Sequence, residues 1–414
     1  MDIYGRISVR IQEKDIMTDN KKRIRKLLRM PVLLSILLTG CKNTAQTEES
    51  AEVNVEIVAT PTPEQRLEIK ITDWLSSHSL KEKVAQLFIV QPEALCNEKT
   101  VAEIEMENAL KEYPVGGIIY FSDNLIDPEQ TKGMIANTKK YYKDNGNLPP
   151  FISVDEEGGL VARIGNAGTF DVETFDPMWY IGETGDPANA AYVGTTIGTY
   201  LHNLGFNLDF APDADVLTNP YNYVIGARAF SDNPHVVSAM VQAESQAMKK
   251  TGVMPVIKHF PGHGGTLGDT HEGYAYTDKT LDQLMEAELI PFQDCIQNHE
   301  ADMIMVAHIS VPSILGDTTP CSLSQYMITD VLRKQMGYDG LVITDSFSMG
   351  AIVNAYDSGT AVIQALQAGV DILLMPQDFH QAYDAIVHAV ESGAVSEERI
   401  NASVRRILRV KLKW

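Results

Sequence analysis

The sequence of 414 residues has little cysteine and little positive charge for its length. Its four cysteines are too few for a scaffold held together by disulfides. Its 34 basic residues face 55 acidic ones, and the net charge of −21 argues against a nucleic-acid binder, which needs a basic face. Hydrophobic residues make up 44% of the chain, so a globular protein is expected and a wholly disordered one is excluded.

The first 40 residues differ in charge from the rest of the chain. They have a net charge of +5, whereas residues 41–414 have a net charge of −26. A basic cluster at 21–29 is followed by an apolar run at 31–40, which is too short to span a bilayer. This order is typical of a secretory signal peptide, for which Met17 is an alternative start. We therefore predict a signal peptide over residues 1–40.

The end of the apolar run, Leu38-Thr39-Gly40-Cys41, resembles the lipobox of bacterial lipoproteins. That resemblance implies lipidation of Cys41 and attachment to the extracytoplasmic face of a bacterial membrane. An ordinary signal peptide cleaved near Gly40 and an inner-membrane anchor are the alternatives. The stretch that follows is polar and acidic and ends in prolines, which predicts a disordered tether. Residues 41–65 are interpreted as the lipidated cysteine and its tether.

From about residue 66 onward, short apolar runs alternate with helical patterns. Several of the runs are apolar throughout, as in parallel strands covered on both faces. Helical patterns between them include 188–204, 234–251, 281–297 and 325–336, and Ser79 begins a capping box. The alternation predicts one α/β domain over residues 66–414, a (β/α)8 TIM-type barrel, with a doubly wound sheet as the alternative. The eight expected strands are 86–90, 117–121, 151–155, 206–212, 255–260, 303–309, 341–345 and 371–375.

Ionisable residues stand at the ends of four expected strands. They are Asp155, the pair Lys258 and His259, His308, and Asp345. A single charged residue at a strand end ordinarily belongs to a turn or caps a helix. In a barrel, however, the carboxyl ends of the strands surround the mouth where active sites form. Four such positions together indicate a polar ligand at that mouth.

The segment 258–271 has the densest concentration of reactive side chains. Its four glycines predict a loop. Asp269 and His271 are two residues apart, so the carboxylate can orient the imidazole for general acid–base catalysis. A metal site built from His259, His263, Asp269 and His271 is one alternative. A glycine-rich loop with solvated polar residues is the simplest one.

The same segment is similar to the signature of glycoside hydrolase family 3, in its β-N-acetylhexosaminidase branch. The similarity covers roughly residues 70–410, and its motifs follow one another in the family's order. Besides 258–264 and 269–271, the matching segments are 80–88, 115–119, 155–159 with Arg163, 226–230, 341–346 and 368–375.

This resemblance implies a retaining exo-acting β-N-acetylhexosaminidase that removes terminal β-N-acetylglucosamine. Asp345 would be the nucleophile, and His271, oriented by Asp269, would be the acid/base. The positions that match the family's sugar-binding residues are Asp155, Arg163, Arg228, Lys258 and His259. The family requires no metal and no cofactor, and a monomer is expected. Peptidoglycan fragments and other glycans ending in N-acetylglucosamine are the expected substrates.

Some features depart from the family pattern or leave other functions open. Ser346 replaces an acid or alanine and is expected to point away from the sugar, and Leu160 replaces a basic or polar residue. The C-terminal α/β sandwich domain of many members is not expected after Trp414. The alternatives are a phosphorylase of the same family, a metal-dependent barrel hydrolase, and a sugar-binding lipoprotein without catalysis.

Overall fold

The computed structural model describes residues 61–414. The predicted signal peptide, the alternative start at Met17, the lipidation site Cys41 and most of the predicted tether lie outside this range. The last residues of the predicted tether are helical, because helix α2 (Pro63–Ser77) begins three residues before the expected domain boundary. Thr62 caps this helix by accepting the Gln65 N–H at 3.2 Å, and proline is favoured at a first helical position.

Eight parallel strands form a closed (β/α)8 barrel, which confirms the predicted fold. The strands follow one another around the barrel in chain order, and β10 pairs with β1. A bridge between Ile343 and Ile372 connects β9 to the start of β10 and closes the ring, so a doubly wound sheet is wrong. The strands are β1 (Phe88–Val90), β2 (Gly117–Ile119), β3 (Phe151–Val154), β6 (Leu208–Asp209), β7 (Met254–Phe260), β8 (Met303–Val306), β9 (Leu341–Thr344) and β10 (Leu373–Leu374).

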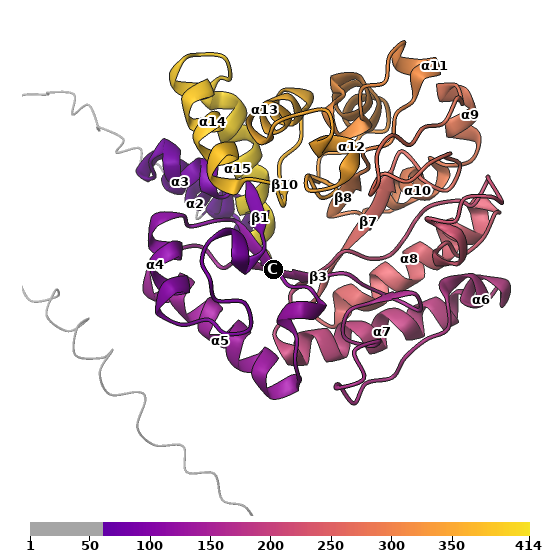
Figure 1. Cartoon of the computed structure of the whole chain (residues 1–414), viewed down its shortest axis with the longest axis horizontal. Helices are drawn as coiled ribbons and strands as arrows, with labels where there is room; N and C mark the ends of the chain where they lie inside the picture. Colours follow the sequence, from indigo (N-terminus) through magenta and orange to yellow (C-terminus); the bar gives the residue numbers. More distant parts are fainter. Residues whose placement is uncertain (1–60) are drawn as a thin grey trace, which may run out of the picture. The chain divides into compact units, whose positions relative to one another are not determined.

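Helices lie outside the strands and complete the barrel (Figure 1). The helices α2 and α3 (Leu80–Ala85) precede the first strand. The others are α4 (Ile104–Glu112), α5 (Pro128–Asp144), α6 (Met178–Glu183), α7 (Pro187–Leu204), α8 (Pro234–Lys250), α9 (Leu281–Glu286), α10 (Ile290–Gln297), α11 (Pro312–Leu315), the π-helix η5 (Tyr326–Gln335), α12 (Gly350–Val353), α13 (Ser358–Ala368), α14 (Phe379–Glu391) and α15 (Glu397–Lys411). Among residues 61–414, no helix combines the length and apolar character needed to cross a membrane.

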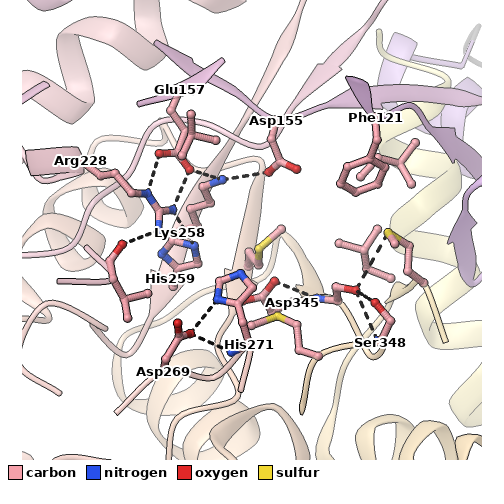
Figure 2. Close-up of a pocket in the computed structure, with 18 of the residues that line it drawn as sticks. Phe121, Asp155, Glu157, Arg228, Lys258, His259, Asp269, His271, Asp345 and Ser348 are labelled. Carbon is pink, nitrogen blue, oxygen red and sulfur yellow. Dashed lines mark hydrogen bonds and ion pairs between the residues drawn. The ribbon is translucent and has the colours of Figure 1, made fainter. Parts of the chain in front are cut away.

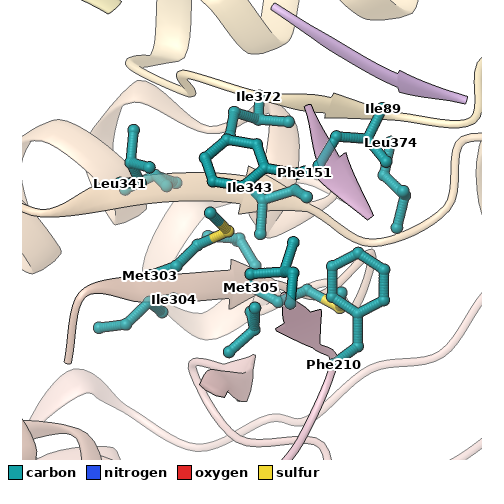
Figure 3. Packing of buried hydrophobic residues seen from close by; sticks show 14 of the residues in the cluster. Ile89, Phe151, Phe210, Met303, Ile304, Met305, Leu341, Ile343, Ile372 and Leu374 are labelled. Atoms are coloured by element: carbon teal, nitrogen blue, oxygen red, sulfur yellow. The ribbon is translucent and has the colours of Figure 1, made fainter. Parts of the chain in front are cut away.

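Apolar side chains from neighbouring strands fill the interior of the barrel. Figure 3 shows Ile89, Phe151, Met305 and Ile343, which come from four different strands, packed in one cluster. All four are at most 3% exposed. Because both faces of these strands are covered, nearly every strand residue is apolar, and this produces the continuous runs seen in the sequence. The core therefore forms a floor beneath the carboxyl ends of the strands.

Local structure differs from the sequence prediction in three places. The expected helix 281–297 is two helices, α9 and α10, because the backbone leaves helical geometry at Ala287. Pro291 has no backbone N–H, so it could not donate the hydrogen bond that would continue the first helix. The expected helix at 325–336 is the π-helix η5. A short antiparallel hairpin, β4 (Glu156–Gly158) with β5 (Val161–Ala162), follows β3 and was not predicted.

Candidate active site

One cavity of about 510 Å³ opens at the carboxyl ends of the barrel strands. Parallel strands that run around a closed ring carry their last residues to the same mouth, so positions far apart in the sequence meet there. Figure 2 shows this site with its side chains. The eight residues that the sequence predicts for catalysis and sugar binding all line the cavity: Asp155, Arg163, Arg228, Lys258, His259, Asp269, His271 and Asp345.

Asp269 and His271 form a hydrogen-bonded pair in the loop after β7. The Oδ1 atom of Asp269 lies 2.7 Å from the Nδ1 of His271 and also accepts the His271 backbone N–H at 2.8 Å. Partial burial raises the pKa of Asp269, but these two hydrogen bonds lower it overall. The His271 ring is 64% exposed at the rim, whereas the Asp269 side chain is only 15% exposed. This arrangement leaves the Nε2 of His271 free to exchange a proton with a ligand.

Asp345 directly follows β9, and in Figure 2 it lies between His271 and Ser348. Its Oδ1 accepts the Ser346 N–H at 2.8 Å. Burial raises the pKa of Asp345, but the His259 and His308 imidazoles and the Ser346 N–H outweigh it and lower the pKa overall. Asp345 is therefore a carboxylate at neutral pH, which is the form that a nucleophile requires.

Glu157 lines the cavity between two cations and was missed by the sequence analysis. Its Oε1 is 2.6 Å from the Nζ of Lys258, and its two oxygens accept from the Nε and Nη2 of Arg228 at 2.9 and 2.7 Å. Burial raises the pKa of Glu157, but the Arg228 and Lys258 charges lower it well below its usual range. The run of three acidic residues at 155–157, at the end of a strand, was the sequence feature from which Glu157 could have been identified.

Lys258 and Arg228 have further acidic partners that fix their positions. Lys258 Nζ lies 3.1 Å from Asp155 Oδ1, and Arg228 Nη2 lies 3.5 Å from Asp213 Oδ2. Burial lowers the pKa of Lys258, but the Glu157 and Asp155 carboxylates raise it above its usual range. Both cations therefore stay charged and need no reorganisation when a polar ligand arrives.

Asp215 holds His259 in one orientation. Its Oδ2 lies 2.7 Å from the Nδ1 of His259, and its Oδ1 accepts the His263 backbone N–H at 2.5 Å. Burial lowers the pKa of His259 to about 4, so the ring is neutral at neutral pH. Because Nδ1–H then donates to Asp215, the Nε2 of His259 carries the lone pair, and Arg228 Nη2 lies 3.4 Å from it.

The four residues of the alternative metal site do not converge. Both nitrogens of the His263 ring are hydrogen-bonded to threonines, Thr266 at 2.8 Å and Thr270 at 3.2 Å. Asp269 and His271 bind one another at the rim. Within residues 61–414, potential ligand atoms gather instead at Asp213, Asp215 and His259. The Asp215–His259 hydrogen bond and the Arg228 guanidinium already occupy that cluster.

Two strand-end residues behave differently from expectation. Ser346 lines the cavity rather than pointing away from it, because its Oγ bonds to that of Ser348 at 2.8 Å. His308 does not line the cavity. Its Nε2 donates to the Ser346 carbonyl at 3.0 Å and its Nδ1 bonds to Ser322 at 2.7 Å, so it supports the segment after Asp345. Leu160 is exposed on the β4–β5 turn and is also absent from the lining.

A sequence model of a known family matches most of the described residues. The model, described as the glycosyl hydrolase family 3 N terminal domain, covers residues 79–410. The chain belongs to glycosyl hydrolase family 3. Beta-hexosaminidase A of Pseudoalteromonas piscicida is 33% identical over 332 residues, which are 75% of this chain and 55% of that protein. Beta-hexosaminidase LpqI of Mycobacterium tuberculosis is 32% identical over 351 residues, which are 80% and 83% of the two chains.

Solved structures of glycosyl hydrolase family 3 have the same fold. A β-N-acetylglucosaminidase from Paenibacillus sp. str. FPU-7 superposes with a TM-score of 0.77 at 35% identity, covering 81% of this chain and 63% of that one. The LpqI structure superposes with a TM-score of 0.70 at 31% identity, covering 81% and 95%. This chain thus spans little more than half of some relatives and most of others.

Proposed function

We propose that the protein is a retaining, exo-acting β-N-acetylhexosaminidase that releases terminal β-N-acetylglucosamine. The observation that carries this proposal is the placement of an ionised carboxylate, Asp345, and a His271–Asp269 pair around one cavity. Family membership and the names of the relatives support the same class of reaction. The apolar floor formed by residues such as Ile119, Met305 and Leu374 closes the cavity below, which favours binding of a chain end.

In the proposed reaction, Asp345 attacks the anomeric carbon of the terminal sugar while His271 donates a proton to the departing glycosidic oxygen. The bond to the leaving group breaks as the bond to the Asp345 carboxylate forms, which gives a covalent glycosyl-enzyme. His271 then takes a proton from water, whose oxygen attacks the same carbon and releases Asp345. Asp269 keeps the His271 ring in place and stabilises its protonated form.

The polar groups below the rim are suited to the hydroxyls of the terminal sugar. Asp155 offers acceptor oxygens, Lys258 and Arg228 offer charged donors, and the neutral His259 offers an Nε2 acceptor that a sugar hydroxyl would share with Arg228. Arg163 lies 3.7 Å from Asp155 and over the ring of Phe121 at the other edge of the cavity. Since charge-assisted hydrogen bonds are the stronger ones, these groups would fix the sugar against Asp345.

The N-terminal sequence supports a place for the reaction. We propose that Cys41 carries a lipid and that residues 1–40 are removed, so that the monomeric enzyme faces outward from a bacterial membrane. Peptidoglycan fragments with terminal N-acetylglucosamine, or other such glycans, are the substrates accessible there.

Asp345→Asn tests the proposal on an aryl β-N-acetylglucosaminide. We expect a loss in kcat of at least about a thousandfold, because the covalent step loses its nucleophile. Asp330→Asn, at an exposed acid of η5, is the matched control and retains activity. Proton NMR of the first product should show free β-N-acetylglucosamine, with or without phosphate and with EDTA present. An α-anomer, a sugar 1-phosphate, or normal turnover by Asp345→Asn would contradict the proposal.

A further inference from the structure

Two exposed tyrosines stand beside the cavity on the segment between β6 and α8. Tyr223 lines the cavity and is nevertheless 72% exposed. Tyr221, two residues earlier, is 86% exposed, more than any other large hydrophobic side chain of the described residues. A large ring left open to solvent at the edge of a polar cavity is typical of a binding surface. We call residues 219–225 the tyrosine loop.

The tyrosine loop is held in place by two asparagine side chains, buried Asn222 and partly buried Asn219. The Oδ1 of Asn222 accepts the backbone N–H groups of Val224 and Ile225 at 3.1 and 2.9 Å. Asn219 Oδ1 accepts the Tyr221 N–H at 3.1 Å. The two rings are therefore carried by a loop with a defined backbone. A rigid aromatic surface loses little conformational entropy on binding.

The same asparagines connect the tyrosine loop to the segment that carries His271. Asn222 Nδ2 donates to the His263 carbonyl at 2.7 Å, and Asn219 Nδ2 donates to the Thr266 carbonyl at 2.8 Å. The tyrosine loop is thus hydrogen-bonded to the segment 258–271 that ends at His271, and Tyr223 and His271 line the same cavity. Phe121 lies across the site from Asp269 in Figure 2, so the opposite wall is a separate surface.

We propose that Tyr223, with Tyr221 beyond it, forms the subsite for the leaving-group sugar, so that the natural aglycone is a pyranose such as a second N-acetylglucosamine rather than a small alcohol. This inference rests on the proposed function. A proton donor must contact the glycosidic oxygen, so the first leaving-group ring lies next to His271. There its apolar face can pack on the Tyr223 ring. Tyr221 does not line the cavity, so in this proposal it contacts a second leaving-group ring.

The test compares substrates that differ only in the leaving group. N,N′-diacetylchitobiose and the chitotriose present one and two leaving-group sugars, whereas N-acetyl-β-glucosaminyl fluoride presents none. We expect Tyr223→Ala to lower kcat/KM about tenfold on both oligosaccharides, the effect of truncating an aromatic anchor, and to change it less than twofold on the fluoride. Tyr221→Ala is expected to lower kcat/KM on the chitotriose alone.

Control variants separate stacking from other causes. Tyr223→Phe retains the ring and should keep kcat/KM on chitobiose within about threefold of the wild type, since packing rather than the hydroxyl carries the effect. Tyr180→Ala removes an exposed tyrosine of α6, outside the cavity lining, and should change nothing. Equal losses on chitobiose and the fluoride, or no loss on either, would overturn the inference. A wild-type protein inactive on the fluoride would instead overturn the proposed function.

Discussion

Replacing Glu157 by glutamine tests whether the site depends on a buried charge shared by two cations. Glu157 is 2% exposed and contacts both Lys258 and Arg228. The amide has nearly the same shape as the carboxylate but lacks its charge. The variant therefore keeps the packing and leaves two neighbouring cations without their shared partner.

The structure gives the expected size of the effect. Neutralising one member of a buried ion pair costs about 3–5 kcal/mol, because the remaining charge stays buried. Lys258 keeps Asp155 at 3.1 Å and Arg228 keeps Asp213 at 3.5 Å, so we expect the lower end, about 3 kcal/mol of unfolding free energy. We also expect kcat/KM to fall about a hundredfold, because the two cations lose their fixed positions against the sugar.

Urea denaturation of both proteins as a function of pH measures the stability effect. The pKa of Glu157 is lower in the folded protein than in the unfolded chain, whose glutamates titrate near about 4.3. The charge therefore stabilises the fold fully above that pH, and its contribution is lost as the pH falls below it. The difference between wild type and variant should be constant from about pH 6 to 7.5 and should shrink below about pH 4.

Glu244→Gln is the matched control. Glu244 is equally buried, but within the described part of the chain its two carboxylate oxygens have no hydrogen-bond partner. Burial raises the pKa of Glu244 well above its ordinary value, which favours its neutral form, so we expect an amide there to be tolerated or stabilising. The reasoning is refuted if Glu157→Gln costs less than about 1 kcal/mol or if both variants cost the same.

Two further predictions concern other parts of the barrel. Lys411 donates to Gln86 and to the Gly116 carbonyl, and burial lowers its pKa to about 7. Between about pH 7 and pH 10 the Lys411 amine is therefore protonated in the unfolded chain but not in the folded protein, so the wild-type free energy of unfolding should rise with pH. In urea titrations, Lys411→Met should remove this rise. Asp269→Asn keeps an acceptor for the His271 N–H but not the charge, so kcat/KM on chitobiose should fall by about 10²–10⁴ while the fluoride is affected less. Equal losses on both substrates would contradict that role for Asp269.

The barrel and the residues around its mouth could be predicted because both follow from the chain's local order. A parallel strand covered on both faces is mostly apolar, so each of the eight strands overlaps one of the short apolar runs of the sequence. Strand direction in a closed barrel then places residues such as Asp155, His259 and Asp345 at one mouth. Their catalytic roles remain predictions until the variants are measured.

The partners of these residues could not be predicted, because they depend on distances between segments far apart in the sequence. Glu157 differs from its neighbour Glu156 only in which strand face it occupies. Glu156 accepts the N–H groups of Ile164 and Gly165 just after the hairpin and the Tyr200 hydroxyl 44 residues away, whereas Glu157 meets Arg228, 71 residues away. The pairing of Asp215 with His259 spans 44 residues and has no local signature either.

The site divides into a buried end and an exposed end, and the proposed chemistry requires both. Lys258 and Glu157, each 2% exposed, hold fixed charges where the terminal sugar would be recognised. His271 is 64% exposed, and in the proposed reaction it first releases a proton to the leaving group and then accepts one from water. A leaving-group sugar on Tyr223 would cover this imidazole during the first step, and its departure would open the same path to water for the second.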